Sequence, residues 1–391
     1  MSSRQSTPPL PHTGRFALPA VLTVLFVTGW GANHFASMIP VLKSTEGLSS
    51  TVLDGAFGIY AIGLLPGLFG GGSLSDRVGR RPVVLTGAVL AGIGNLMMVG
   101  WHDATGVLVG RLVVGLGAGL TIGAGTAWAA DLRGKSGATL AGALLTTGFA
   151  MGPVITGLLA ELAPRPLAVP FLVSGIVSLL VAAVATVLTP ATPGHHGPHR
   201  TDVDEDTRRS VGRALSWSVP MALWVFASVT VAVVVLAARI SDRYSGAWVP
   251  GVAAAVALGT GVLIQFAVRR AHVGQTAGVV GAALAAVGFT LTALAGAHPS
   301  MPVFLVTSIV LGLAYGLCLR DGLMDVEACA PVRSRGAVTG IFYVACYLGF
   351  GLPVLLTTIT PWTGITAPMV VLAVAAAIAS AQRAIRLRRI G

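Results

Sequence analysis

The sequence consists of long apolar runs separated by short polar segments. Each run is about as long as the ~20 mostly apolar residues that a bilayer-spanning helix needs. The runs are apolar all round, whereas a transmembrane barrel would alternate polar and apolar residues over roughly 10-residue segments. The pattern therefore predicts an all-α membrane protein with twelve transmembrane helices. We expect these helices near 17–40, 51–74, 82–100, 104–130, 138–160, 167–189, 217–238, 247–268, 276–297, 302–323, 336–358 and 363–382.

One polar segment separates the runs into two groups of six. Residues 190–215 are rich in Pro, Gly and charged residues, which is the composition of a linker. Two such groups are typical of transporters built from two repeated bundles around a site at the membrane midplane. We therefore predict an N-terminal tail at 1–16, six-helix bundles at 17–189 and 216–382, and a basic tail at 383–391.

The basic residues predict an orientation. If the N-terminus is cytoplasmic, twenty of the 25 Lys and Arg fall in cytoplasmic segments. Four fall in outer loops, namely Lys43, Arg165, Arg239 and Arg243. Because cytoplasmic loops carry an excess of Lys and Arg, we expect a multi-pass protein of the plasma (inner) membrane with both termini cytoplasmic. The net charge of +11 then reflects topology and contact with lipid headgroups, not nucleic-acid binding.

Composition excludes several classes of protein. Only 10% of the residues are charged, against roughly 25% in soluble proteins, which argues against a water-soluble enzyme. Three cysteines encode no disulfide scaffold. The sequence has no phosphate-binding G-x-x-x-x-G-K-[ST] motif and no H-E-x-x-H metal motif. We therefore expect no cofactor, no metal and no catalysis.

The clearest motif lies between the second and third predicted helices. Residues 72–85 read GSLSDRVGRRPVVL. This segment resembles the loop signature of the major facilitator superfamily, G-x-L-x-D-R-x-G-R-R/K-x-x-x-L. The resemblance implies a gating loop that contains Gly72, Asp76, Arg77, Gly79, Arg80 and Arg81.

Glycines and an acidic partner support this interpretation. We expect Gly72 to let two helices approach closely and Gly79 to permit the tight turn between them. Asp131 follows at the end of the fourth predicted helix. The resemblance implies that Asp131 pairs with Arg80 or Arg81 and latches the cytoplasmic side in the outward-open state. A surface ion pair of about 0–1 kcal/mol is the alternative.

Arg111 lies within the fourth predicted helix, in a stretch that resembles the R-x-x-x-G-x-G element of the superfamily. An arginine at a helix centre costs about 2.5–3.5 kcal/mol on insertion and is functional by default. His34 and Asp54 fall at a similar depth, in the outer half of the membrane. We predict a proton relay in which His34 or Asp54 takes up a proton and Arg111 responds. The alternatives are an arginine bonded to carbonyls, a hydrogen-bonded core histidine, and a helix N-cap near 49–51.

The fifth predicted helix carries Gly148, Gly152, Pro153 and Gly157. It resembles the G-x-x-x-G-P-x-x-G-G element of proton-coupled drug exporters, although Thr156 replaces one glycine. Gly148 and Gly152 predict close helix packing, and Pro153 can kink the helix. Ordinary small-residue packing is the alternative.

Polar and aromatic residues predict a mainly apolar substrate cavity. The candidates are Asn33, Trp224, Gln265, Tyr315, Tyr343 and Tyr347, for which interhelical packing or an interfacial belt is the alternative.

A charged group also lies at the end of the tenth predicted helix. We expect Arg320, Asp321, Asp325 and Glu327 to lie at headgroup level and to gate the cytoplasmic side. Arg333 and Arg335 are the expected partners of these acids.

Taken over the whole chain, the sequence resembles the twelve-helix permeases of the major facilitator superfamily. The resemblance implies alternating access by two bundles in a monomer. We predict proton-coupled efflux of a small lipophilic compound. The alternative is a facilitator or proton symporter for a sugar or other small metabolite, which would need hydroxyl-binding groups that these runs mostly lack. An intramembrane enzyme would need paired acids or clustered ligands within the runs.

Overall fold

The computed structural model describes residues 14–191, 209–240, 243–271, 273–331 and 334–389. Throughout this part of the chain the regular secondary structure is helical, as predicted. Eleven of the described helices are long and apolar enough to cross a membrane. The predicted span 82–100 corresponds to α4 (Arg80–Met97), which is not among the eleven. Its first two residues are arginines, which lower its hydropathy.

The helices of residues 14–188 pack around α5 (Ala104–Leu162). This helix contacts all the others in the first half, although its contact with α6 is small. Two residues inside α5 leave the helical conformation, and one of them, Gly134, has a φ of +60°. They separate the spans Ala104–Gly134 and Ser136–Leu162, in agreement with the predicted helices. The helices around α5 are α1 (Gly14–Asn33), α2 (Phe35–Thr45), α3 (Ser50–Val78), α4 and α6 (Val169–Leu188).

The helices of residues 211–388 form the second half of the protein. Its central element, α11 (Met301–Cys329), packs on α7, α9 and α10, while α14 packs on α10. The remaining elements are α7 (Val211–Thr230), α8 (Ala237–Ile240), α9 (Trp248–Arg270), α10 (Thr276–Leu294), α12 (Arg335–Tyr347), α13 (Leu352–Thr363) and α14 (Ala367–Arg388).

Two irregular turns interrupt the helices of this half. A π-helical turn, Val231–Leu236, joins α7 to α8, and a 3-10 turn, Leu348–Gly351, joins α12 to α13. The hydroxyl of Thr230, the last residue of α7, donates to the carbonyl of Gly349 at 2.9 Å and so ties the residue before the π-turn to the 3-10 turn. Such π-turns inside long helices frequently mark functional positions.

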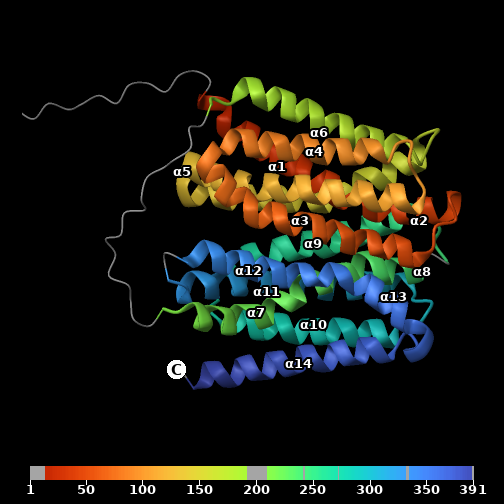
Figure 1. Cartoon of the computed structure of the whole chain (residues 1–391). Coiled ribbons are helices and arrows are strands. Elements are labelled where there is room, and N and C mark those ends of the chain that lie inside the picture. Colours follow the sequence, from red (N-terminus) through yellow and green to blue (C-terminus); the bar gives the residue numbers. More distant parts are fainter. Residues whose placement is uncertain (1–13, 192–208, 241–242, 272, 332–333, 390–391) are drawn as a thin grey trace, which may run out of the picture.

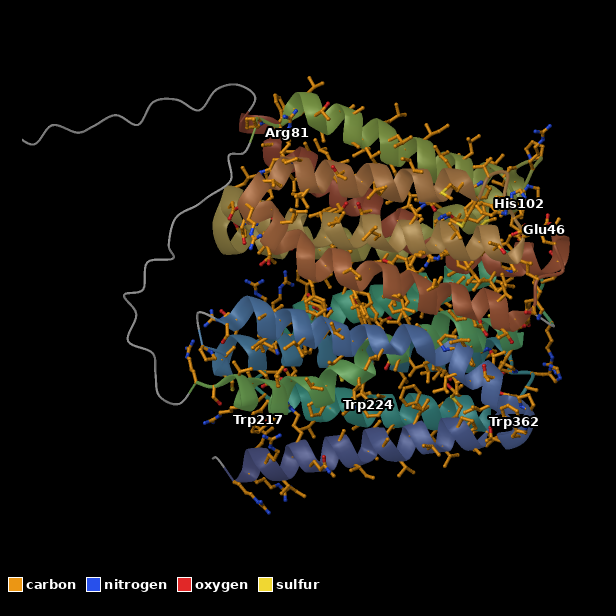
Figure 2. All side chains as sticks on the ribbon, in the orientation of Figure 1. Glu46, Arg81, His102, Trp217, Trp224 and Trp362 are labelled. Atoms are coloured by element: carbon orange, nitrogen blue, oxygen red, sulfur yellow. The ribbon has the colours of Figure 1, made fainter. Side chains whose placement is uncertain are left out.

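The two halves lie side by side (Figure 1). They meet where α5 packs on α9 and where α3 packs on α12 and α13. We name the two ends of the molecule by residues labelled in Figure 2. Arg81 and Trp217 lie near one end, the Arg81 end, and Glu46, His102 and Trp362 lie near the opposite end, the Glu46 end.

Two helices are longer than the apolar pattern predicts. The helix expected at 302–323 continues to Cys329, and the helix expected at 363–382 continues to Arg388. Most of the predicted basic tail at 383–391 is therefore helical. Of the predicted linker, residues 192–208 lie outside the described residues, as do 1–13 of the predicted N-terminal tail.

Candidate functional site

The predicted gating loop is a tight turn between α3 and α4. Gly79 is the one residue between these helices, and its φ of +99° is a conformation that residues with a Cβ rarely adopt. This confirms the turn expected at Gly79. Arg77 is exposed on the last turn of α3.

Arg80 bridges two acids at the Arg81 end. Its Nη1 lies 2.6 Å from Asp76 Oδ1, and its Nε donates to Asp131 Oδ2 at 2.8 Å. The residue that meets Asp131 is therefore Arg80, whereas Arg81 donates to the carbonyl of Thr186. All three groups of the bridge belong to the first half, so it joins α3, α4 and α5 to one another.

The close helix approach expected at Gly72 is wrong. A Cβ at Gly72 would meet nothing within 4 Å. The glycines that face α5 closely lie one and five residues earlier, at Gly71 and Gly67. A Cβ at Gly67 would lie 2.6 Å from the carbonyl oxygen of Leu116 in α5, and one at Gly71 would lie 3.2 Å from Leu120 Cα.

Arg111 is fully buried and bonded to backbone. Its Nη1 donates to the carbonyl of Ala32 at 2.8 Å and its Nε to that of Ala56 at 3.3 Å. These bonds tie α1 and α3 to α5. The guanidinium also lies over the rings of Phe35, Phe57 and Tyr60, at 4.7, 5.7 and 4.4 Å from their centroids.

His34 and Asp54 have separate partners. Nε2 of His34 lies 2.9 Å from Asn95 Oδ1, and its ring meets Phe171 edge-on. The Asp54 carboxylate accepts a hydrogen bond of 2.5 Å from the Thr357 hydroxyl. Asp54 does not cap its helix, because the Ser49 hydroxyl accepts the N–H of Val52.

The three predicted relay residues therefore share one level of the first half without touching. Arg111 binds the carbonyls of residues two positions from His34 and two positions from Asp54. Among the described residues, no carboxylate forms an ion pair with Arg111. The environment of Arg111 matches the carbonyl-bonded alternative, and that of His34 matches the hydrogen-bonded one.

The glycines of the predicted exporter element face two different helices. A Cβ at Gly152 would lie 2.8 Å from the carbonyl oxygen of Trp30, and one at Gly148 would lie 3.0 Å from the Trp30 nitrogen, so both pack on α1. A Cβ at Gly157 would lie 2.8 Å from the Ala247 carbonyl, at the start of α9. The carbonyl of Pro153 accepts the Ser37 hydroxyl at 2.7 Å. The element thus packs on α1 of the first half and on the start of α9 of the second half.

A cavity of about 290 Å³ lies between the two halves at the Glu46 end. Its wall is mostly apolar and includes Ile39, Leu53, Val234 and Met369, from α2, α3, the π-turn and α14. Ligand pockets in proteins begin at about 300 Å³ and are mostly apolar with a few polar groups. The polar lining residues include Lys43, Ser50, Asp54, Arg239, Thr357 and Thr360.

The predicted cavity residues lie elsewhere, and none of the six lines this cavity. The Asn33 amide donates to the Phe149 carbonyl at 2.8 Å, and Gln265 donates within its own helix. Trp224 packs on Phe289. Tyr343 packs on Phe342.

Tyr315 and Tyr347 belong to an aromatic cluster that sequence reasoning missed. Both pack on Phe226, with ring centroids at 6.2 and 4.8 Å. Phe226 in turn meets Phe350, which contacts Phe57 and Tyr60 of the first half. Because Phe57 and Tyr60 also flank Arg111, the cluster links Arg111 to the second half. The signal available in the sequence was the set of aromatic residues in otherwise aliphatic helices.

The acids at the end of α11 lie differently from the prediction. Asp321 and Asp325 are buried within the protein, and both contact the guanidinium of Arg383 on α14, a residue that the sequence placed in the basic tail. Arg333 lies outside the described residues. Among the described residues, no group of three His, Cys, Asp or Glu side chains could hold a metal ion.

Known proteins resemble the chain in sequence. The protein described as "Multidrug resistance protein MdtL" of Klebsiella pneumoniae is 32% identical over 105 residues, or 27% of this chain and 26% of that protein. The "Quinolone resistance protein NorA" of Staphylococcus aureus is 24% identical over 169 residues, or 42% of each chain. The matched stretches therefore span less than half the length of these relatives.

Solved structures resemble the fold. A POT family transporter in complex with 5-aminolevulinic acid superposes with a TM-score of 0.80 at 15% identity, over 96% of this chain and 98% of the other. A bacterial homologue of the human lysosomal transporter Spinster, inward-facing and unoccupied, superposes with a TM-score of 0.72 at 14% identity, over 97% of each chain. The sequence profile of the Major Facilitator Superfamily matches residues 21–352. The chain belongs to the Major Facilitator Superfamily and has the helical fold of its transporters.

Proposed function

We propose that the protein is a proton-coupled exporter of a small lipophilic compound that works by alternating access. The Asp54 carboxyl carries this proposal. It lies in the wall of an apolar cavity between the halves, and its bond to Thr357 connects α3 of the first half to α13 of the second. The names of the sequence relatives, which are resistance proteins, agree with export.

The proposed topology has twelve membrane-crossing helices in two bundles, 17–189 and 216–382, with a cytoplasmic linker at 190–215. The twelfth crossing is α4, which packs along α5 and α6 within the first half. Both termini are cytoplasmic in the plasma membrane, because this orientation places most basic residues inside. The Arg81 end is then cytoplasmic and the Glu46 end faces outward.

A proton at Asp54 would control closure of the outer end. The side chain is 9% exposed, with the two halves packed around it. Burying an ionised carboxylate is far more costly than burying the neutral acid. Proton uptake from outside would therefore favour closure at the Glu46 end, and proton release inside would favour reopening with substrate bound. Arg111 holds the carbonyls next to Asp54 and His34, and so couples these positions to the aromatic cluster.

The Arg80 bridge would act at the cytoplasmic end. It fastens α4 to both α3 and α5 through exposed contacts, so it would hold the cytoplasmic end of the first half together in the outward-open state and release it as the halves rock. The bridge is the proposed latch of the gating loop.

Inverted membrane vesicles test the proposal. With the lumen acidified, addition of a lipophilic dye or antibiotic should raise the lumenal pH as protons leave in exchange. Asp54→Asn should abolish this response, because the amide binds no proton. His34→Ala tests the second proposed relay residue in the same way. Asp103→Asn is the matched control, because Asp103 is an exposed N-cap near the same end and asparagine also caps helices well.

Each other outcome has a definite meaning. Proton release that survives Asp54→Asn and His34→Ala would keep the exchange and remove the relay. No response to any compound, together with faster uptake of sugars or other metabolites by whole cells, would replace export by import.

A further inference from the structure

The second half contains a buried group of three charges that the proposed transport mechanism does not use. Asp321 and Asp325 lie one turn apart on α11, and Arg383 reaches them from α14. Their side chains are 0%, 1% and 4% exposed. Arg383 lies 5.2 Å from the ring centroid of Trp217 on α7, which places the group near the Arg81 end (Figure 2).

Arg383 is shared unequally between the two acids. Asp325 receives both arms of the guanidinium, with Oδ2 at 2.8 Å from Nη1 and Oδ1 at 3.1 Å from Nη2. Nη1 also donates to the Trp217 carbonyl at 3.2 Å. Asp321 contacts Arg383 only through Oδ2 and Nη2. Its Oδ1 is buried and makes no hydrogen bond within the described part of the chain.

The neighbouring basic groups on the same two helices do not balance the second acid. Arg320 turns its Nη2 to the carbonyl of Val273 at 3.2 Å. Arg386 lies over the outer face of Trp217 at 4.1 Å and donates to the carbonyl of Ser216 at 2.7 Å. Both guanidinium groups therefore bond to peptide carbonyls, and neither forms an ion pair with Asp321 among the described residues.

The other helices packed on α11 and α14 add no closer charge. The ionisable residue of α7 is Arg213, and those of α9 are Arg269 and Arg270, all exposed at the Arg81 end. Within Thr276–Leu294, α10 has no ionisable side chain, but the backbone N–H of Gly278 in its first turn donates to the Asp321 carboxyl. On α11 the buried thiol of Cys318 lies near Asp321. On α12, Arg335 is half-buried. With both acids ionised, the buried group would carry a net charge of −1.

We propose that Asp321 and Asp325 bind one proton between them at neutral pH, held on Oδ1 of Asp321. A proton from water adds to the carboxylate to give the neutral acid, whose Oδ2 still accepts from Arg383. Asp325 remains ionised and keeps the two-armed contact. The three groups are then neutral overall, which avoids the large penalty of an unpaired buried carboxylate.

A small cavity gives water a place beside this group. It has a volume of about 30 Å³ and is lined by Ser216, Trp217, Gln382 and Arg383, among others. A single water needs at least about 10–15 Å³ of such space and two or more polar partners. Gln382, which lines this cavity beside Arg383, is exposed near the Arg81 end. Proton exchange would therefore take place with the solution at that end.

Infrared spectroscopy of the purified full chain in lipid nanodiscs tests this proposal directly. At neutral pH the spectrum should contain the carbonyl band of a buried protonated carboxyl. Asp321→Asn should remove the band, because the remaining Asp325 is paired with Arg383 and ionised. Asp325→Asn should remove the band as well, because Asp321 would then be the only acid paired with the Arg383 guanidinium and would be ionised. All spectra are compared in an Asp54→Asn background, which removes any contribution from the outer carboxyl.

The controls are Asp76→Asn and Asp131→Asn, the acids of the exposed bridge, which should leave the band unchanged. The proposal is overturned if neither Asp321→Asn nor Asp325→Asn changes the protonated-carboxyl region. Loss of the band in the Asp321→Asn variant alone would also contradict sharing, because Asp321 would then hold its proton independently of Asp325. Since this readout involves no substrate, it stands or fails independently of export.

Discussion

Each half of the protein carries an arginine between two aspartates near the Arg81 end, and the surroundings of the two groups differ. In the first half Arg80 is 20% exposed, and its partners Asp76 and Asp131 are 59% and 56% exposed. In the second half all three groups are buried. Both groups therefore contain one arginine and two aspartates, but the group in the first half is exposed to solvent and the group in the second half is enclosed by packed helices.

Exposure to solvent decides what each group can do. Water screens the exposed bridge, so a surplus carboxylate there costs little and the contacts can break and re-form. Burial removes that screening, so the second group must be balanced internally, and its contacts are expensive to break. The exposed bridge is suited to a moving latch, and the buried group to a fixed structural element that binds a proton.

The largest predicted effect breaks the buried group. Arg383→Met should lower the free energy of unfolding by about 3–5 kcal/mol, because two buried carboxylates lose their partner. The matched change Arg80→Met should cost about 0–1 kcal/mol. Thermal unfolding of the purified proteins in one detergent measures both.

If Arg383→Met does not accumulate, a triple variant keeps the comparison testable. Asp321→Asn and Asp325→Asn combined with Arg383→Met remove every charge and should recover most of the lost stability. Equal losses for Arg80→Met and Arg383→Met would contradict the distinction between the groups.

A smaller effect is expected from crowding the buried group. A Cβ at Gly278 on α10 would collide with Asp321 Oδ2 and lie 2.7 Å from Arg383 Nε. Gly278→Ala should therefore destabilise by about 1–3 kcal/mol, as overpacking does. Gly72→Ala, beside the exposed bridge, should be neutral or slightly stabilising, because its Cβ enters open space and alanine favours helix. Thermal unfolding of the two variants measures both changes in stability. A larger loss of stability for Gly72→Ala than for Gly278→Ala would contradict tight packing around the buried group.

The smallest effect concerns salt. Asp131→Asn should destabilise by about 0–1 kcal/mol at low salt, and the loss should shrink at high salt because the exposed pair is screened. The stability change caused by Asp321→Asn should not depend on salt, since ions do not reach the buried group. Unfolding is followed for both at two salt concentrations. A salt-dependent change at Asp321 would indicate access to solvent.

Part of this arrangement could be predicted from the sequence alone. Most helices could be predicted because a bilayer demands long apolar runs, and the turn at Gly79 because a short connection needs a positive φ. The ends of the helices at Cys329 and Arg388 could not be predicted in this way. Asp321, Asp325 and Arg383 were assigned to headgroups and a tail because charges normally end a membrane helix. In the structure both helices continue through these residues, which contact one another inside the protein.

Contacts between distant residues were the second limit. The pair of Asp131 with an arginine of the 72–85 loop was predicted because a family pattern names both partners. Nothing in a single sequence indicates that Arg383 meets Asp321, or that Thr357 meets Asp54. The depth of Arg111, His34 and Asp54 followed from counting along helices. Their separate partners depend on how the helices are rotated.

In the proposed mechanism a proton gradient drives export. The most direct measurement follows accumulation of a fluorescent lipophilic substrate in sealed inverted vesicles with an acidic lumen. The substrate should accumulate, the accumulation should collapse when a protonophore dissipates the gradient, and vesicles carrying Asp54→Asn should show none. Accumulation that continues at an unchanged level after the protonophore would contradict it.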